Sequence, residues 1–236
     1  SYFKSNRIES ATTVWVEDAE KYFNKKFDTF KNSGLPTHFF YVLAKEDDTK
    51  VKISRSGLSY KLITSGSEEE DGEWITYTSN NEITLNTDDK VYFKAGNSNI
   101  YDWSGGKKFY CYHNSDKDGL FVVGGNIASL IDGKNFETNE LKNWVFANSY
   151  SFAEFFKGHT RLYDASDLVL PMTKCFTGCY KSMFDNCSGL IYTPQNLPAT
   201  ELATSCYESM FSGCVNMLGI PDGLLPRTVP AYQAVY

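Results

Sequence analysis

The sequence predicts an α+β chain with three consecutive parts: an N-terminal segment with an amphipathic helix, an antiparallel β-sandwich-like domain and a short solenoid of repeats. Three observations support this prediction. Apolar residues near the N-terminus recur with a helical period, those of the middle section alternate with a period of two, and a phrase near the C-terminus occurs twice. The predicted boundaries are 1–36, 37–124 and 125–236, and we expect the repeat array to continue beyond residue 236.

Composition narrows the class of protein. The 236 residues suffice for one large or two small domains, and 42% hydrophobic with 22% charged residues is typical of a globular protein. The net charge of −6 argues against a nucleic-acid partner, because neutralising phosphates requires a basic patch. No apolar stretch approaches the roughly 20 residues of a membrane helix. The N-terminus lacks the apolar core of a signal peptide, so either a leader was cleaved or none was used.

The first predicted element is a helix from about Glu17 to Lys31. Acidic residues in its first turn and lysines towards its end match the helix dipole, and Gly34 and Pro36 end it. Such a helix must bury its apolar stripe, either against its own domain or by self-association or docking to a partner. The predicted stripe consists of Ala19, Phe23, Phe27 and Phe30.

Short strands are predicted from His38 to about Val123. Leu58, Tyr60 and Leu62 alternate with polar neighbours, which indicates a strand with one buried face. Many short strands separated by polar turns favour an antiparallel sandwich over βαβ units. A short helix is expected next, over 127–131. The expected strands lie near residues 39–45, 49–54, 58–62, 73–78, 82–86, 90–94, 107–113 and 119–124.

The repeat phrase is CYKSMFDNC from Cys179, which returns as CYESMFSGC from Cys206, and a degenerate copy begins at Phe152. In a solenoid, equivalent apolar positions stack because no single unit can bury its own face. The spacing i, i+1, i+4, i+5, i+8 predicts one side of a short helix plus its capping turn. The predicted repeat core consists of Phe152, Phe155, Phe156, Cys179, Tyr180, Met183, Phe184, Cys187, Leu190, Cys206, Tyr207, Met210, Phe211 and Cys214.

Metal ligation, disulfides and core packing are the three candidate roles for the repeat cysteines. The separation of Cys179 from Cys187 exceeds that of the C-x2-C half-sites of ordinary zinc modules. Cys111 and Cys175 have no counterpart in the repeat, which weakens a disulfide framework. Free cysteine is a small, often buried hydrophobe, so we predict free thiols in the core, with no metal and no cofactor.

The units LPATELATSCYESMFSGCVNML and LPMTKCFTGCYKSMFDNCSGLIYTP resemble BspA-type leucine-rich repeats, found in surface proteins of host-associated bacteria and in some phage proteins. Upstream, GEWITYTSNNEITLNTDDKVYFKAG and GNIASLIDGKNF resemble the small β-rich region that often precedes such repeats. The resemblance covers about residues 40–236 and departs in the first copy, where Phe155 stands in place of Met and His159 in place of Cys. It implies a leucine-rich-repeat solenoid displayed outside the cell.

Nothing in the sequence singles out a catalytic site. The three histidines, His38, His113 and His159, lie in separate segments, and no nucleophile elbow, zinc-protease motif or phosphate-binding loop occurs. Residues 114–119 mimic half of a calcium loop, but Gly125 stands where a bidentate Glu is required. We therefore predict no catalytic and no metal-binding residues. A glycan-degrading enzyme of a virion or cell surface is the alternative, although no carboxylate pair is singled out.

The predicted function is a non-enzymatic, surface-displayed recognition or adhesion module. Expected partners are a protein or glycan on a cell surface, and the N-terminal helix is expected to join copies of the chain or to bind a virion partner. Neither nucleic acid nor a membrane span is expected. The predicted localisation is extracellular, and two carriers stay open: a bacterial surface protein whose leader was cleaved, or a phage virion fibre or decoration protein.

Overall fold

The computed structural model describes residues 38–68, 72–96, 109–113, 117–134, 136, 149–221 and 224. The chain divides into two units between Pro36 and Thr37, and every described residue lies in the second unit. The predicted N-terminal helix, with the stripe of Ala19, Phe23, Phe27 and Phe30, therefore lies outside the described residues.

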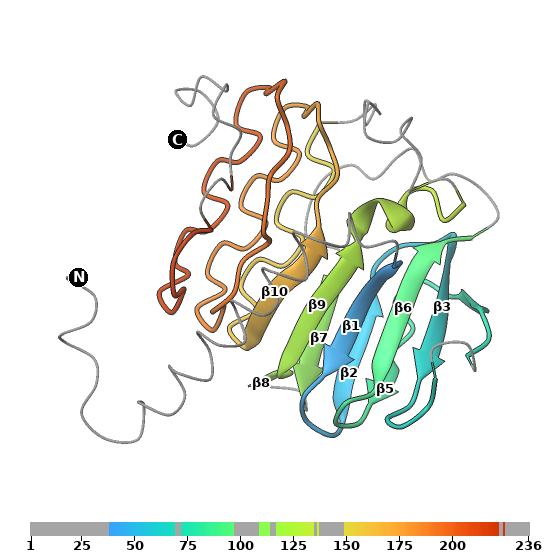
Figure 1. The fold of residues 1–236 in the computed structure, drawn as a ribbon. Coiled ribbons are helices and arrows are strands. Elements are labelled where there is room, and N and C mark those ends of the chain that lie inside the picture. Colours follow the sequence, from blue (N-terminus) through green and yellow to red (C-terminus); the bar gives the residue numbers. More distant parts are fainter. Residues whose placement is uncertain are drawn as a thin grey trace, which may run out of the picture. The chain divides into compact units, whose positions relative to one another are not determined.

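The described residues form two β-sheets and a series of turns beside them (Figure 1). The larger sheet has the strand order β10-β9-β1-β6-β3-β4, and the smaller one has the order β5-β2-β7-β8. The strands are β1 Phe40–Ala44, β2 Thr49–Ile53, β3 Leu58–Ile63, β4 Ile75–Tyr77, β5 Ile83–Leu85, β6 Lys90–Ala95, β7 Phe109–His113, β8 Lys117–Asp118, β9 Phe121–Asn126 and β10 Leu162–Val169.

The two sheets bury their apolar faces against each other. Strand β1 shows the predicted alternation, since Phe40, Val42 and Ala44 are fully buried while the residues between them are partly exposed. The ring of Phe40 lies 6.3 Å from that of Phe109 in β7, and so bridges the two layers. Phe155, which belongs to the repeats, lies 6.1 Å from Phe40. The sandwich and the repeats therefore share one hydrophobic core.

The predicted α+β class is wrong for the part of the chain that the structure describes. Its one helix, η2 (Ile127–Leu130), is a single 3-10 turn capped by the side chain of Asn126. The larger sheet is mixed rather than antiparallel, because β10 runs parallel to β9. The boundary expected after residue 124 falls inside β9. A leucine-rich-repeat solenoid is not shown either, since the described repeats beyond β10 contain only isolated β-bridges.

Consecutive four-residue turns, not helices, make up the repeats. In the first copy, Phe155 donates its amide to the carbonyl of Phe152, and every second amide bonds three residues back in the same way. Positive φ angles recur at every fourth position, at Tyr150, Glu154, Gly158, then Gly178, Ser182, Asn186, then Ser205, Ser209, Gly213. A left-handed residue interrupts a right-handed helix and suits the third position of a turn. The period is therefore four residues, which is why the i, i+4, i+8 spacing mimicked a helix.

Successive copies are joined by a ladder of backbone hydrogen bonds. We name the three stretches coil 1 (residues 149–159), coil 2 (residues 176–187) and coil 3 (residues 203–214). Amides that do not bond within a coil donate to the next coil, as from Phe152 to Cys179 (2.8 Å) and from Tyr180 to Cys206 (2.9 Å). Each of the two steps contains five such bonds, at alternate residues, with N···O distances of 2.7–3.0 Å.

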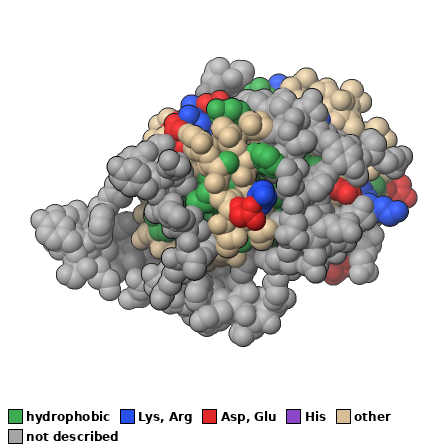
Figure 2. Space-filling view, turned by 90° about the horizontal axis from the view of Figure 1, so that it is seen from above, with side chains coloured by type: hydrophobic (Ala, Val, Ile, Leu, Met, Phe, Trp, Pro, Cys, Tyr) green, Lys and Arg blue, Asp and Glu red, His purple; other side chains and the backbone are tan. Residues whose placement is uncertain are grey.

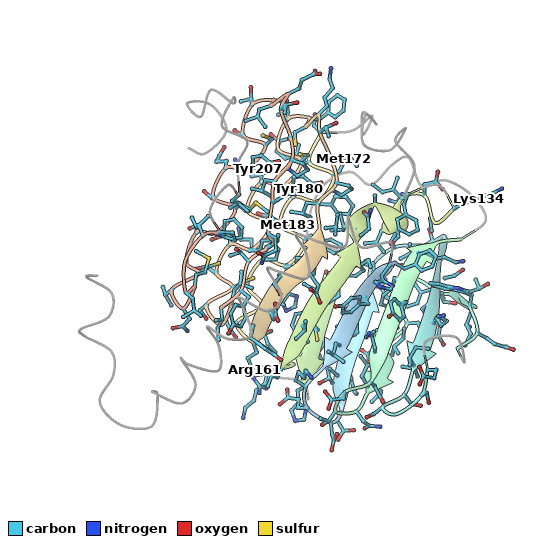
Figure 3. The ribbon with its side chains drawn as sticks, viewed as in Figure 1. Lys134, Arg161, Met172, Tyr180, Met183 and Tyr207 are labelled. Atoms are coloured by element: carbon cyan, nitrogen blue, oxygen red, sulfur yellow. The ribbon has the colours of Figure 1, made fainter. Side chains whose placement is uncertain are left out.

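Aromatic rings stack between the coils at the same repeat distance. Phe152, Tyr180 and Tyr207 form one stack, with ring centroids 6.2 and 5.8 Å apart. Phe156, Phe184 and Phe211 form the second stack, with centroids 5.3 and 5.5 Å apart. Figure 3 shows Tyr180 and Tyr207 on neighbouring coils. The backbone ladder sets this spacing, so ring stacking and hydrogen bonding support each other.

Replacing Phe184 by Ala should destabilise the protein far more than replacing Phe211. Phe184 is fully buried between two rings, and removing such a side chain typically lowers the free energy of unfolding by about 3–5 kcal/mol. Phe211 stacks on one ring only and is partly exposed, so its removal leaves less of a cavity. Urea unfolding of both variants measures the difference; equal losses would contradict the stacking order.

Candidate functional site

The predicted repeat core lies inside the protein. All of its residues are buried except Phe211, which is partly buried and packs against the others. The outermost cysteines of coils 2 and 3 face the preceding coil. Cys187 donates its thiol to the carbonyl of Phe156, and Cys214 donates to that of Phe184, both at 3.0 Å.

The thiols are poorly suited to nucleophilic or metal chemistry. All six cysteines are free and buried. Burial raises the pKa of Cys214 to about 11 and raises that of Cys111 well above its ordinary value. Hydrogen bonds with neighbouring thiols, together with burial, raise the pKa values of Cys175 and Cys206. Since the thiolate is the reactive form, these groups are unreactive near neutral pH. Among the described residues, no set of His, Cys, Asp or Glu side chains could hold a metal ion.

Thiol labelling should therefore depend on unfolding. We expect a maleimide to react slowly with the native protein and to label six cysteines per chain in denaturant without reductant, because all six are free and buried. Mass spectrometry counts the added groups. Fewer than six labels in denaturant would reveal a disulfide.

The histidines do not form a catalytic group with one another. His38 is exposed just before β1, and His113 and His159 border a polar cluster that the sequence did not predict. We name it the junction cluster, made of Glu46, Asp118, His159, Thr160 and Arg161. It joins the sandwich to the segment between coil 1 and β10. Figure 3 shows Arg161 near the ends of β9 and β10.

Charge-assisted hydrogen bonds hold the junction cluster together. Arg161 binds both carboxylate oxygens of Glu46, at 2.6 and 2.9 Å, and donates to the carbonyl of Asp118 at 3.1 Å. The carboxylate of Asp118 accepts two bonds from Thr160, both 2.7 Å long, and lies 3.7 Å from Nδ1 of His159. Leu120 donates its amide to Glu46. Both carboxylates are thus engaged in binding other parts of the chain, which indicates an anchoring role.

His159 has a structural reason to replace cysteine. In coils 2 and 3 the residue at this position bonds back to a phenylalanine carbonyl of the preceding coil. Coil 1 follows the sandwich instead, and Nε2 of His159 lies 3.4 Å from the carbonyl of Phe109. The imidazole also packs edge-on against the rings of Phe109 and Phe121. The longer side chain performs for the sandwich what the thiol performs between coils.

Acid should weaken the junction through Asp118. Burial alone would raise the pKa of this carboxyl, but its interactions with His159 and Thr160 more than offset that effect and hold it at about 2. Because the folded pKa lies below the ordinary value of 3.8, the stabilisation is complete above about pH 4 and is lost as pH falls towards 2.

We expect Asp118→Asn to lower the melting temperature at pH 7, with a difference from wild type that narrows towards pH 2.5. Calorimetry across this range measures it. Asp48→Asn, at an exposed turn residue, is the control and should change little. A difference that stays constant with pH would contradict the role of the ionised Asp118.

The outward face of the smaller sheet carries the best candidate for a binding site. Lys50 and Lys52 of β2 pair across the sheet with Tyr112 and Tyr110 of β7. The intervening residues of both strands point into the core, so these four side chains share the outer face. Exposed Thr84 of β5 lies opposite Lys50. We name Lys50, Lys52, Glu82, Thr84, Tyr110 and Tyr112 the tyrosine–lysine strip.

Cation–π contacts and one carboxylate organise the strip. The ammonium of Lys52 lies 5.4 Å from the ring centre of Tyr110 and 5.5 Å from that of Tyr112. Glu82 lies 3.9 Å from Lys50 and 3.8 Å from Lys52, and it accepts a hydrogen bond from the Tyr112 hydroxyl. Burial and this carboxylate raise the pKa of Tyr112 to about 12, so its phenol stays neutral. Two lysines and one glutamate leave the strip with a charge of +1.

Elsewhere on the surface the charges are mixed. On the face seen in Figure 2, Lys or Arg side chains lie beside Asp or Glu side chains. Several such pairs join neighbouring coils, including Lys157 with Asp185 at 3.1 Å and Lys181 with Glu208 at 2.6 Å. Such exposed pairs contribute little energy and offer no field of one sign to a ligand.

Comparisons with protein-family models, curated proteins and solved structures find no match to this chain. Within the described ranges, no helix is long and apolar enough to cross a membrane. The site therefore has to be judged on its own geometry. Sequence reasoning missed the tyrosine–lysine strip, although the alternation in TKVKI and FYCYH was a usable signal for outward Lys and Tyr. Which two strands are neighbours was not readable from the sequence.

Proposed function

We propose that the protein is a non-enzymatic recognition or adhesion module that binds an acidic glycan through the tyrosine–lysine strip. The observation that carries this proposal is the pairing of two tyrosine rings with two lysines on one sheet face. Tyrosine combines an apolar ring with a polar hydroxyl, which suits surfaces that must contact both kinds of group.

The chemistry of the strip matches that of a charged sugar chain. A pyranose ring has apolar C–H faces, which pack on aromatic rings, and hydroxyl edges, which pair with groups such as Thr84 and Tyr112. The strip carries a positive charge in a chain of net charge −6, which favours a carboxylated or sulfated glycan. The ordered β-strands beneath these side chains hold them in place before the ligand arrives, which reduces the entropy lost on binding.

Display outside the cell rests on the resemblance of the repeats to BspA-type leucine-rich repeats. The two carriers remain a bacterial surface protein and a phage virion fibre or decoration protein. Both roles require contact with cell-surface polymers, so the proposed ligand class serves either one.

Binding to immobilised acidic polysaccharides tests the proposal. Tyr110→Ala with Tyr112→Ala should weaken binding about tenfold or more, because losing aromatic stacking and one hydrogen bond removes the main contacts. Tyr150→Ala is the matched control, since Tyr150 is also exposed but lies in coil 1. Calorimetric titration with soluble fragments then measures the affinity.

Three outcomes would overturn the proposal. The first is the absence of binding to any acidic glycan by the wild-type protein. The second is an equal loss of binding in Tyr150→Ala. The third is release of shortened sugars from the polysaccharide by the purified protein, detected by mass spectrometry, which would instead favour a glycan-degrading enzyme.

A further inference from the structure

Coil 3 presents a row of backbone donors that lack the partners found in the earlier coils. Five alternate amides of coil 1 donate to coil 2, and five of coil 2 donate to coil 3. Within the described part of the chain, no residue accepts a hydrogen bond from the corresponding amides of coil 3. We name this row the donor edge, and its amides belong to Ser205, Tyr207, Ser209, Phe211 and Gly213.

The apolar side chains of coil 3 and of the segment after it are also less covered than those of coil 2. Phe184 and Leu190 are fully buried, whereas their counterparts Phe211 and Met217 are only partly buried. Nearby, Val215, Leu218 and Ile220 are 66%, 54% and 60% exposed. Thus the same positions that one coil covers in the preceding coil are left open here.

Hydrogen-bond chemistry decides what fits this edge. A second copy related by a two-fold axis would bring its own donor edge against this one, and two rows of N–H groups cannot pair. The carbonyls of coils 2 and 3 already accept bonds from coils 1 and 2. An occupant must therefore offer its own row of carbonyls at alternate residues, as in peptide recognition by strand addition. It must also place rings over Tyr207 and Phe211.

We propose that the donor edge binds a coil of the same kind supplied by another polypeptide, that is, a segment carrying the CYxSMFxxC phrase folded as consecutive turns. This partner reproduces all three features that join the coils here: the five-bond ladder, the two ring stacks and the cysteine-to-carbonyl bond. Unpaired backbone edges of this type are general docking sites for added chains.

A fluorescent peptide with the sequence of residues 200–221 tests the proposal, used with the full chain under reducing conditions. Fluorescence anisotropy should show saturable binding. Leu218→Asp and Ile220→Asp should each weaken it about tenfold, because each places a charge beside the docked coil. Both residues are more than half exposed, so these variants should fold normally. Ile75→Asp is the matched control, since Ile75 is 49% exposed on β4, at the opposite end of the larger sheet from β10.

Several results would overturn this inference. One is the absence of saturable binding at peptide concentrations up to on the order of 1 mM. Another is equal binding of a scrambled peptide, or equal weakening by Ile75→Asp, either of which would indicate general apolar adhesion. A third is a dimer, seen by light scattering without peptide, that Leu218→Asp dissociates, because this would make a second copy the occupant. None of these outcomes depends on the tyrosine–lysine strip.

Discussion

The hydrogen bonds from every second amide of one coil to the carbonyls of the next are the constraint on which the repeats depend. The amides between them close turns within the coil, so each peptide group along the coil has a partner in one direction or the other. This division of donors requires a residue with positive φ at every fourth position, and serine, asparagine, glutamate and glycine occupy those places in the three coils. The strain of non-glycine residues there, such as Ser182 and Ser209, is offset by the ladder and by the ring stacks that the ladder aligns.

The same logic explains how an irregular stack of turns joins a β-sandwich. Parallel pairing of β10 with β9 carries the backbone from the larger sheet into the repeats, and the next coil continues this direction through the bridge between Asp164 and Tyr192. Phe155 and Phe156 pack against the aromatic residues of the sandwich core, while His159 reaches the Phe109 carbonyl. The junction cluster then binds the outer side of this joint. Sandwich and repeats are therefore one cooperative structure rather than independent modules.

The two surfaces with proposed roles arise from ordinary features of this fold. In the smaller sheet, strand alternation places aliphatic side chains inside and leaves tyrosine and lysine outside, where two neighbouring strands bring them into contact. In coil 3, the ladder that joins the earlier coils leaves its last row of donors available. One surface is polar and aromatic and suits a sugar chain, whereas the other is a backbone edge flanked by apolar side chains and suits a polypeptide. They are separate and can act at the same time.

The sequence by itself determined the local elements. Its period-two alternation predicted all of the longer sandwich strands to within about two residues, and its repeated phrase identified the side chains that stack, since both patterns reflect which residues must leave water. It did not determine the class of the repeats, because a period of four resembles the helical period of 3.6 over only nine residues. Strand β10 was missed because Asp164 and Ser166 are buried polar residues in an interrupted parallel pairing, which shows no alternation. Only the tertiary structure decided that Lys52 lies beside Tyr110 and Tyr112, that His159 meets the sandwich, and that coil 3 keeps unpaired donors. These are relations between segments far apart in the chain, and no local preference encodes which strand or coil becomes a neighbour.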